Sequence, residues 1–258
     1  MHRIEAELLI PGRGGPVHDG VVVLDGARIS YAGPAGVAPA TPGTPVTWAT
    51  TVMPGMWECH GHLIGTRTFD LGQLPLEPEA LRAGVRTIEH GTYLDDECCD
   101  AMRETDAILV PTRTIIEDML SFRDAVPPYA MAKLDAMADR HAQAVTRAYE
   151  HGVTIAMGTD IALTGPDRAN AWGQNGSEPG YLVKLGMSPL EAIEAATASG
   201  PLTLGPQAPR SGQLAEGYDA DVLTLDADPL ADIGILADPA RITTVWTRGR
   251  QVKRPVTA

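Results

Sequence analysis

Residues 53–62, Met-Pro-Gly-Met-Trp-Glu-Cys-His-Gly-His, contain the most informative motif of the chain. Alternate side chains of a strand point to the same side, so a strand here would project His60 and His62 in one direction. Their spacing suits one divalent ion. Taken alone, an H-x-H pair is weak evidence, because two histidines around a glycine also occur by chance. The pair gains weight from matching groups at the ends of other predicted strands.

Two further apolar runs end in residues that bind metals. One run closes with Ile-Glu-His90-Gly and another with Met-Gly-Thr-Asp160. The strands of a (β/α) barrel converge with their C-terminal ends on one site, so His60, His62, His90 and Asp160 are predicted to meet around a metal. A turn or helix-capping aspartate is the alternative role for Asp160. Ligands of this type suit zinc first, with manganese, iron or cobalt as alternatives.

The pattern of apolar residues differs between the two ends of the chain and its middle. Short β-like runs separated by glycine and proline turns fill the first fifty residues and predict an antiparallel sheet, and similar runs return after residue 218. If the two ends pair, they form one small β-sandwich. Between them, apolar runs alternate with helical or loop segments, a pattern that is typical of α/β folds. These runs are 85–90, 107–112 and 153–159.

Two helices have clear local signals. Residues 131–151 are rich in Ala, Leu and Met at helical spacing and stop before a glycine. Ser188 and Glu191 form a capping box with proline between them, which opens a helix over 190–198. We interpret His141 and His151, on the long helix, as solvated residues rather than ligands.

The composition restricts the class of partner. The 258 residues have a formal net charge of -13, which disfavours nucleic acid and anionic membrane surfaces as partners. A small-molecule substrate is therefore expected. No stretch of about eighteen apolar residues occurs, and the N-terminus has charges where a signal peptide would be apolar, so a cytoplasmic protein is predicted. The 3 cysteines are an odd number and are expected to be reduced thiols.

Several motifs together resemble those of the amidohydrolase superfamily, in particular its imidazolonepropionase and prolidase-like branch. VMPGMWECHGHL is similar to the first barrel strand of that family, AGVRTIEHGTYLDDE to the sixth, ILVPTRT to the seventh and VTIAMGTD to the eighth. The segment that begins LGMSPLEAIEAATASGP resembles the last barrel helix and the returning β-sandwich. The resemblance implies that His60, His62, His90 and Asp160 are metal ligands.

The chain departs from the family pattern in its middle. Members of this type generally have a carboxylated lysine on the fourth strand and a further metal-binding histidine on the fifth, and neither is found here. An eight-unit barrel needs about 250 residues, whereas residues 53–207 provide about 155. Strands two to five are therefore predicted to be absent. The predicted fold is α/β, an incomplete (β/α) TIM-type barrel (53–207) with a small β-sandwich domain built from both chain ends (1–52 and 208–258).

The function implied is a metal-dependent amidohydrolase that cleaves an amide, lactam or dipeptide-like C–N bond through metal-activated water. Asp160 would move the proton and His90 would polarise the carbonyl oxygen. One ion is favoured over two, because His60, His62 and Asp160 make one ligand set and leave His90 alone for a second. The alternative is a truncated, catalytically inactive homologue that acts as a binding or interaction subunit. An artefact of the gene model or of the cloned sequence is a third explanation of the missing strands.

Substrate contacts are predicted for three residues near strand ends, Arg67, Arg113 and Trp172. An arginine there would hold a substrate carboxylate by a bidentate contact, although pairing with Glu117 or Asp118 is the plainer alternative. An open barrel would also expose sheet edges and apolar surface, which predicts a homo-oligomer or a partner chain that covers them.

Overall fold

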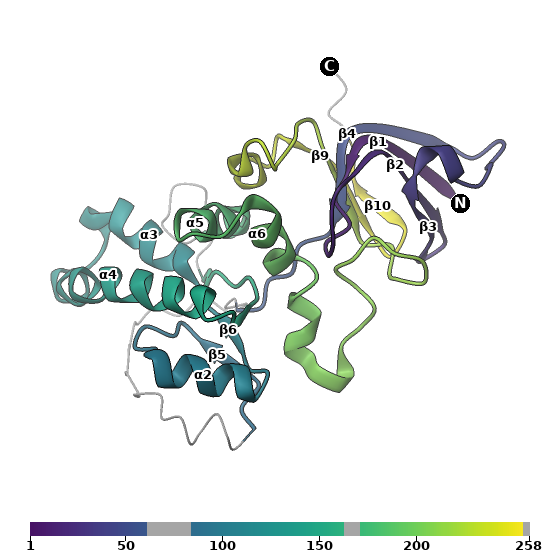
Figure 1. Ribbon diagram of the computed structural model, residues 1–258. Coiled ribbons are helices and arrows are strands. Elements are labelled where there is room, and N and C mark those ends of the chain that lie inside the picture. The colour runs from purple at the N-terminus through teal and green to yellow at the C-terminus, as the bar shows by residue number, and fades with distance from the viewer. Residues whose placement is uncertain (61–83, 163–170, 255–258) are drawn as a thin grey trace. The chain divides into compact units, whose positions relative to one another are not determined.

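The computed structural model describes residues 1–60, 84–162 and 171–254 (Figure 1). The chain divides into two compact units. The β unit comprises Met1–Trp57 and Ala196–Ala258, and the α/β unit comprises Glu58–Ala195. The sequence analysis predicted that the β domain comprises residues 1–52 and 208–258, so the observed boundaries at 57 and 196 differ from the predicted ones by 5 and 12 residues. Element labels follow Figure 1.

The β unit contains one seven-stranded sheet in the order β10-β9-β8-β4-β1-β2-β3. Its strands are β1 (His2–Leu9), β2 (Val17–Asp25), β3 (Arg28–Pro34), β4 (Val46–Pro54), β8 (Val222–Leu225), β9 (Ile242–Thr247) and β10 (Arg250–Lys253). Its short 3-10 helices are η1 (Ala35–Val37), η4 (Gly200–Gln207) and η5 (Ile233–Ala237). β4 pairs with β8, so strands from the two ends of the chain share one sheet.

The expectation of an antiparallel sheet is wrong for one pair of strands. β1 and β4 run parallel, with Arg3 opposite Val46 and Leu9 opposite Val52. A parallel pair cannot be joined by a tight turn and needs a crossover connection. Here β2, β3 and the proline-rich segment that follows them make that connection.

Apolar side chains of the strands form the core of the β unit. In β1 the buried residues Ile4 and Ala6 alternate with half-buried or exposed neighbours, as expected for a strand with one face in a core. Val22 and Leu24 of β2 and Trp246 of β9 belong to the same cluster. Burial of apolar surface is thus what stabilises this unit.

The α/β unit contains a three-stranded parallel sheet in the order β5-β6-β7. Its elements are β5 (Thr87–Glu89), α2 (Asp96–Glu104), β6 (Ile108–Val110), α3 (Arg113–Ser121), η2 (Arg123–Ala125), α4 (Pro128–Glu150), β7 (Thr154–Ile155), η3 (Asn175–Ser177), α5 (Glu178–Lys184) and α6 (Pro189–Ala196). The three strands lie within the three apolar runs predicted from the sequence and are shorter than those runs.

The predicted helices are confirmed with small shifts at their ends. α4 occupies 128–150 and α6 occupies 189–196. The capping box is present, because the backbone N–H of Ser188 donates to Glu191 Oε2 (2.8 Å) and that of Glu191 donates to Ser188 Oγ (3.3 Å). No helix in the described ranges combines the length and the apolar composition that crossing a membrane requires.

The interpretation of His141 as a solvated residue is wrong. Its side chain is fully buried, with Nε2 2.8 Å from the carbonyl oxygen of Pro111. Along α4, Leu134, Ala138, His141 and Val145 are all buried. They recur every three or four residues, so they share the face of α4 that packs inward.

Candidate metal centre

His60, His90 and Asp160 come together beyond the ends of the parallel strands. One ligand atom from each lies within 4.8 Å of the others. His60 Nε2 is 3.4 Å from Asp160 Oδ1, and the ring centroids of His60 and His90 are 5.0 Å apart. Two tetrahedral ligands that are each about 2.0–2.1 Å from a zinc ion lie roughly 3.4 Å from one another. The His60–Asp160 pair therefore has the separation expected of two ligands of one ion.

Backbone hydrogen bonds bring the segment that precedes and includes His60 beside the end of β7. The N–H of Cys59 donates to the carbonyl of Met157 (3.0 Å), and the N–H of Asp160 donates to the carbonyl of His60 (2.7 Å). Residues 100 positions apart in the sequence are thereby held next to one another. The carbonyl of His60 also accepts from Thr159 N–H at 3.2 Å.

Three residues of this region have left-handed backbone conformations. The φ angles are 65° for His90, 54° for Thr112 and 57° for Asp160. A residue with a side chain bears a steric cost in this conformation, typically about 1–3 kcal/mol, and such residues gather at functional sites. His90 and Thr112 follow β5 and β6 within two residues, and Asp160 lies five residues beyond β7.

Each imidazole has a hydrogen-bond partner at Nδ1. His60 Nδ1 is 2.7 Å from Glu89 Oε2, and His90 Nδ1 is 2.6 Å from Thr112 Oγ1. Metal-binding histidines usually have such a partner, which fixes the orientation and tautomer of the ring. A proton on His60 Nδ1 leaves the lone pair of Nε2 facing Asp160. Sequence reasoning missed Glu89 and Thr112, although both are neighbours of predicted strand ends.

The two carboxylates around His60 raise the pKa of its imidazole to about 10. The hydrogen bond with Asp160 is the largest cause, the one with Glu89 follows, and burial acts in the opposite direction. The two carboxylates thus favour a proton on the ring when no ion is bound. A cation ligated by Nε2 would take the place of this proton.

The carboxylate of Glu58 connects the segments that contain His60 and Asp160. Its Oε1 accepts from the backbone N–H of His60 (3.0 Å) and of Thr159 (2.9 Å). Its Oε2 accepts from Thr159 Oγ1 (2.6 Å) and Asn175 Nδ2 (2.8 Å). Sequence reasoning missed Glu58, whose position two residues before His60 was the available signal.

A second carboxylate, Glu178, is fully buried at the start of α5. It accepts hydrogen bonds from the backbone N–H of Arg113 (2.8 Å), the backbone N–H of Thr114 (2.6 Å) and Thr114 Oγ1 (2.6 Å). These N–H groups belong to the first turn of α3 and have no partner within the helix. Burial raises the pKa of Glu178 to about 7, and the hydrogen bonds with Thr114 and Arg113 oppose this rise.

The residues predicted to contact the substrate do not belong to the cluster of His60, His90 and Asp160. Arg113 is 6% exposed, and its guanidinium donates to Glu117 Oε1 (2.9 Å) and the carbonyl of Ala138 (2.7 Å). Trp172 is 40% exposed. Substrate contacts by Arg113 and Trp172 stay predictions. His62 and Arg67 lie outside the described residues.

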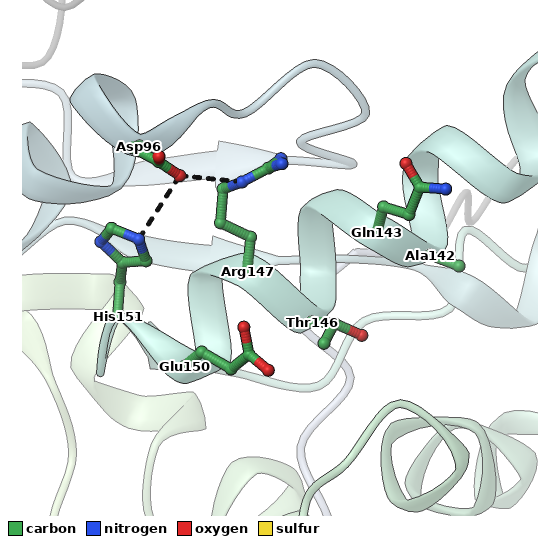
Figure 2. Close-up of a pocket in the computed structure, with 7 residues that line it drawn as sticks. All are labelled: Asp96, Ala142, Gln143, Thr146, Arg147, Glu150 and His151. Carbon is green, nitrogen blue, oxygen red and sulfur yellow. Dashed lines mark ion pairs between the residues drawn. The ribbon is translucent and has the colours of Figure 1, made fainter.

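A surface pocket of about 490 Å³ lies away from these residues, on α4 and the start of α2 (Figure 2). Its lining residues are Asp96, Ala142, Gln143, Thr146, Arg147, Glu150 and His151. Asp96 Oδ1 pairs with Arg147 Nε (2.9 Å) and lies 3.5 Å from His151 Nε2 (Figure 2). None of His60, His90 and Asp160 lines this pocket, so its position gives it no part in a reaction at those residues.

Comparison with known proteins identifies the family of the chain. The model of the amidohydrolase family matches residues 60–252. The chain is also 44% identical over 177 residues to the ochratoxinase of Aspergillus niger, a match that covers 68% of this chain and 35% of the ochratoxinase. The matched region thus represents about a third of that relative.

Solved structures give the same fold. The crystal structure of A. niger ochratoxinase superposes with a TM-score of 0.84 at 24% identity and spans 100% of this chain and 96% of the other. A Xaa-Pro dipeptidase with methionine bound in its active site superposes with a TM-score of 0.79 at 17% identity and spans 98% and 99%. At these identities the likeness establishes the fold alone.

Proposed function

The chain belongs to the amidohydrolase family, and on this premise we propose that it is a metal-dependent hydrolase of amide-type C–N bonds. The observation that carries the proposal is the cluster of His60, His90 and Asp160, whose ligand atoms lie within 4.8 Å of one another. A relative called ochratoxinase supports a hydrolase. The fold likeness to a Xaa-Pro dipeptidase is compatible with a dipeptide-like substrate, and amides and lactams are the other candidates.

The donor set fits a divalent cation, zinc first. Two imidazole nitrogens and one carboxylate oxygen would hold it, and His62 is a further predicted ligand outside the described residues. We favour one ion over two. When bound, the cation supplies Lewis acidity, which lowers the pKa of a water molecule toward about 7 and polarises a carbonyl.

Asp160 is the proposed general base and general acid. In hydrolysis a water oxygen bonds to the carbonyl carbon, the C–N bond breaks, and one water proton ends on the leaving nitrogen. The Asp160 carboxylate would accept this proton and pass it on. Asp160 is 7% exposed, so little solvent competes for its oxygens. If His90 is not a ligand of the ion, its ring would instead polarise the carbonyl oxygen of the substrate.

We further propose that the barrel of this chain is incomplete. Since 177 residues are 35% of the ochratoxinase, that protein has about 177/0.35, or about 500 residues, against 258 here. The structural superposition nevertheless spans 96% of the ochratoxinase chain. The additional residues of the relative therefore fall within the superposed span, which supports the loss of internal strands predicted from the sequence.

The same difference in length favours a second candidate function. A chain that lacks the loops after strands two to five would position a substrate poorly. It would then be a catalytically inactive homologue that acts as a binding or interaction subunit. In either case we propose that a second copy or a partner chain covers the open barrel, which size-exclusion chromatography with light scattering tests.

Metal content and hydrolysis, measured on the same preparation, separate the two functions. The purified protein is analysed for bound metal and incubated with a panel of N-acyl amino acids and Xaa-Pro dipeptides, with His60→Ala as the control. We expect about one zinc per chain and turnover that His60→Ala abolishes. Stoichiometric zinc without turnover by either form would favour the inactive subunit. A protein that takes up no divalent ion would contradict both the metal site and the hydrolase.

A further inference from the structure

We propose that Glu58 and Glu178 are positioning residues, which hold His60, His90 and Asp160 at the separations that one divalent cation requires. The inference rests on the proposed function. Neither carboxylate belongs to the ligand cluster. Both nevertheless accept hydrogen bonds from segments that contain or adjoin the ligands. Glu58 contacts the segments of His60 and Asp160, and Glu178 contacts the segment next to Thr112, the partner of His90.

Glu58 sets the distance between His60 and Asp160. One carboxylate oxygen accepts from the N–H groups of His60 and Thr159, so the two segments share a single acceptor. The other oxygen accepts from the Thr159 hydroxyl at 2.6 Å. Asp160 directly follows Thr159 in the chain. Any movement of Thr159 away from His60 would therefore widen the 3.4 Å gap between the two ligand atoms.

Glu178 acts on His90 through the start of α3. It accepts from the N–H groups of Arg113 and Thr114 and from the Thr114 hydroxyl. These residues directly follow Thr112, whose Oγ1 lies 2.6 Å from His90 Nδ1. Because Glu178 is fully buried, water cannot replace its hydrogen bonds without opening the core.

One short segment connects the two carboxylates. Asn175, at the start of η3, donates to Glu58, and Glu178 lies three residues further along at the start of α5. The segment 175–178 is thus bonded both to the His60–Asp160 side and to the His90 side. A ligand cluster assembled from separate strand ends gains its rigidity from such outer contacts, whose loss typically weakens metal binding about 10–100-fold.

A purely structural role, in which the carboxylates only cap turns and helices, makes a different prediction. General loosening would disturb both histidines in either variant or neither of them. The positioning role predicts a selective pattern, in which Glu58→Gln disturbs the His60 ring and Glu178→Gln disturbs the His90 ring. Glu191→Gln is the matched control, because Glu191 also caps a helix of the α/β unit, through Ser188, but does not contact the cluster.

The first measurement uses the metal-free protein. Two-dimensional ¹⁵N NMR of the imidazole nitrogens at fixed pH would report the environment of each ring among the 7 histidines. We expect the selective pattern for the two glutamine variants and an unchanged spectrum for Glu191→Gln. Where a glutamine variant does not fold, Asn175→Ala or Thr114→Val removes a single hydrogen bond of the same network. Equal disturbance of both rings, or of neither, would overturn the inference.

The second measurement is zinc affinity, from competition with a chromogenic chelator. We expect binding about 10–100-fold weaker than wild type in Glu58→Gln and in Glu178→Gln, and no change in Glu191→Gln. A wild-type protein without zinc affinity would contradict the proposed function, and the spectra of the metal-free rings would still decide the positioning role. Wild-type zinc affinity retained in both glutamine variants would overturn the positioning role alone.

Discussion

The β unit and the α/β unit bury different kinds of side chain. Within the described residues, the buried polar side chains of the β unit all end in hydroxyls: Thr51, Thr197, Ser199, Ser211, Thr224 and Thr244. The α/β unit buries a guanidinium, an imidazole and two carboxylates, those of Arg113, His141, Asp160 and Glu178. Burying ionisable groups is costly unless they are paired and hydrogen-bonded. The α/β unit bears this cost where it holds the candidate metal centre.

Positive φ angles of residues other than glycine occur in both units. In the β unit, Asp19 within β2 and Arg248 in the tight turn between β9 and β10 have positive φ angles. In the α/β unit, two of the residues with positive φ are the candidate ligands His90 and Asp160. From the buried ionisable groups we propose that the β unit contributes stability and the α/β unit contributes chemistry. Four predictions test whether the two units differ in this way.

The largest effect is expected for Asp160→Asn. The amide keeps the size of the side chain but cannot accept and pass on a proton as a carboxylate does. We expect turnover to fall by about 10²–10⁴-fold, the range typical for loss of a general acid–base group. Steady-state kinetics at saturating zinc would measure the fall. Turnover within twofold of wild type would remove Asp160 from the mechanism.

A matched pair of core substitutions compares the two units directly. Ile4 in the β unit and Leu109 in the α/β unit are both fully buried. Each change to alanine should lower the free energy of unfolding by about 2–5 kcal/mol. We expect only Leu109→Ala to weaken zinc binding as well, since β6 leads directly to the site. Equal zinc affinities in the two variants, by chelator competition, would argue against the division.

The pH dependence of the free energy of unfolding should reveal the titration of the buried Glu178 carboxyl group. Its pKa is raised from 4.5 in the unfolded chain to about 7 in the folded state. The folded state therefore holds the proton more tightly, so this contribution is complete below about pH 4.5 and is lost as the pH rises through 7. We expect a loss of about 1–3 kcal/mol between pH 5 and 8 that is absent in Glu178→Gln.

Denaturant unfolding of both proteins across this range would measure the difference. His141 acts in the other direction, because burial lowers the pKa of its imidazole to about 4 and its protonation destabilises the fold as the pH falls below 6.5. Since both proteins contain His141, its contribution cancels in the comparison. Parallel stability curves for wild type and Glu178→Gln would contradict the assignment.

The smallest effect is expected at the start of α2. The Asp95 side chain accepts a hydrogen bond from the N–H of Cys98 (2.9 Å) and so caps the helix. Asp95→Ala should cost about 1 kcal/mol, and Asp95→Asn, which can still cap, should cost less. Thermal unfolding would measure both. We expect zinc affinity to stay unchanged, and a change with either variant would show that this cap is coupled to the site.

The sequence predicted most elements because their patterns are local. The capping box at Ser188 and the apolar runs around β5, β6 and β7 needed no knowledge of distant residues. The orientation of β1 against β4 was not predictable in this way, because alternating burial looks alike in parallel and antiparallel strands. The burial of His141 was readable, since it follows Leu134 and Ala138 at helical spacing.

The candidate site was predictable only in part. His60, His90 and Asp160 follow apolar runs, and the convergence of strand ends brought them together in the prediction. The sequence analysis predicted that His90 meets the other ligands around a metal, but in its one-ion reading left His90 alone for a second position. The structure groups His90 with His60 and Asp160. The roles of Glu58 and Glu178 were not predicted, because their partners Thr159 and Thr114 lie 101 and 64 residues away in the chain.

Anomalous X-ray scattering at the zinc edge, from crystals grown with excess zinc, tests the central claim most directly. We expect one strong peak at about 2.0–2.2 Å from His60 Nε2 and the Asp160 carboxylate, and in contact with an imidazole nitrogen of His90. Zinc bound only elsewhere, with these three side chains free of it, would contradict the proposed metal centre.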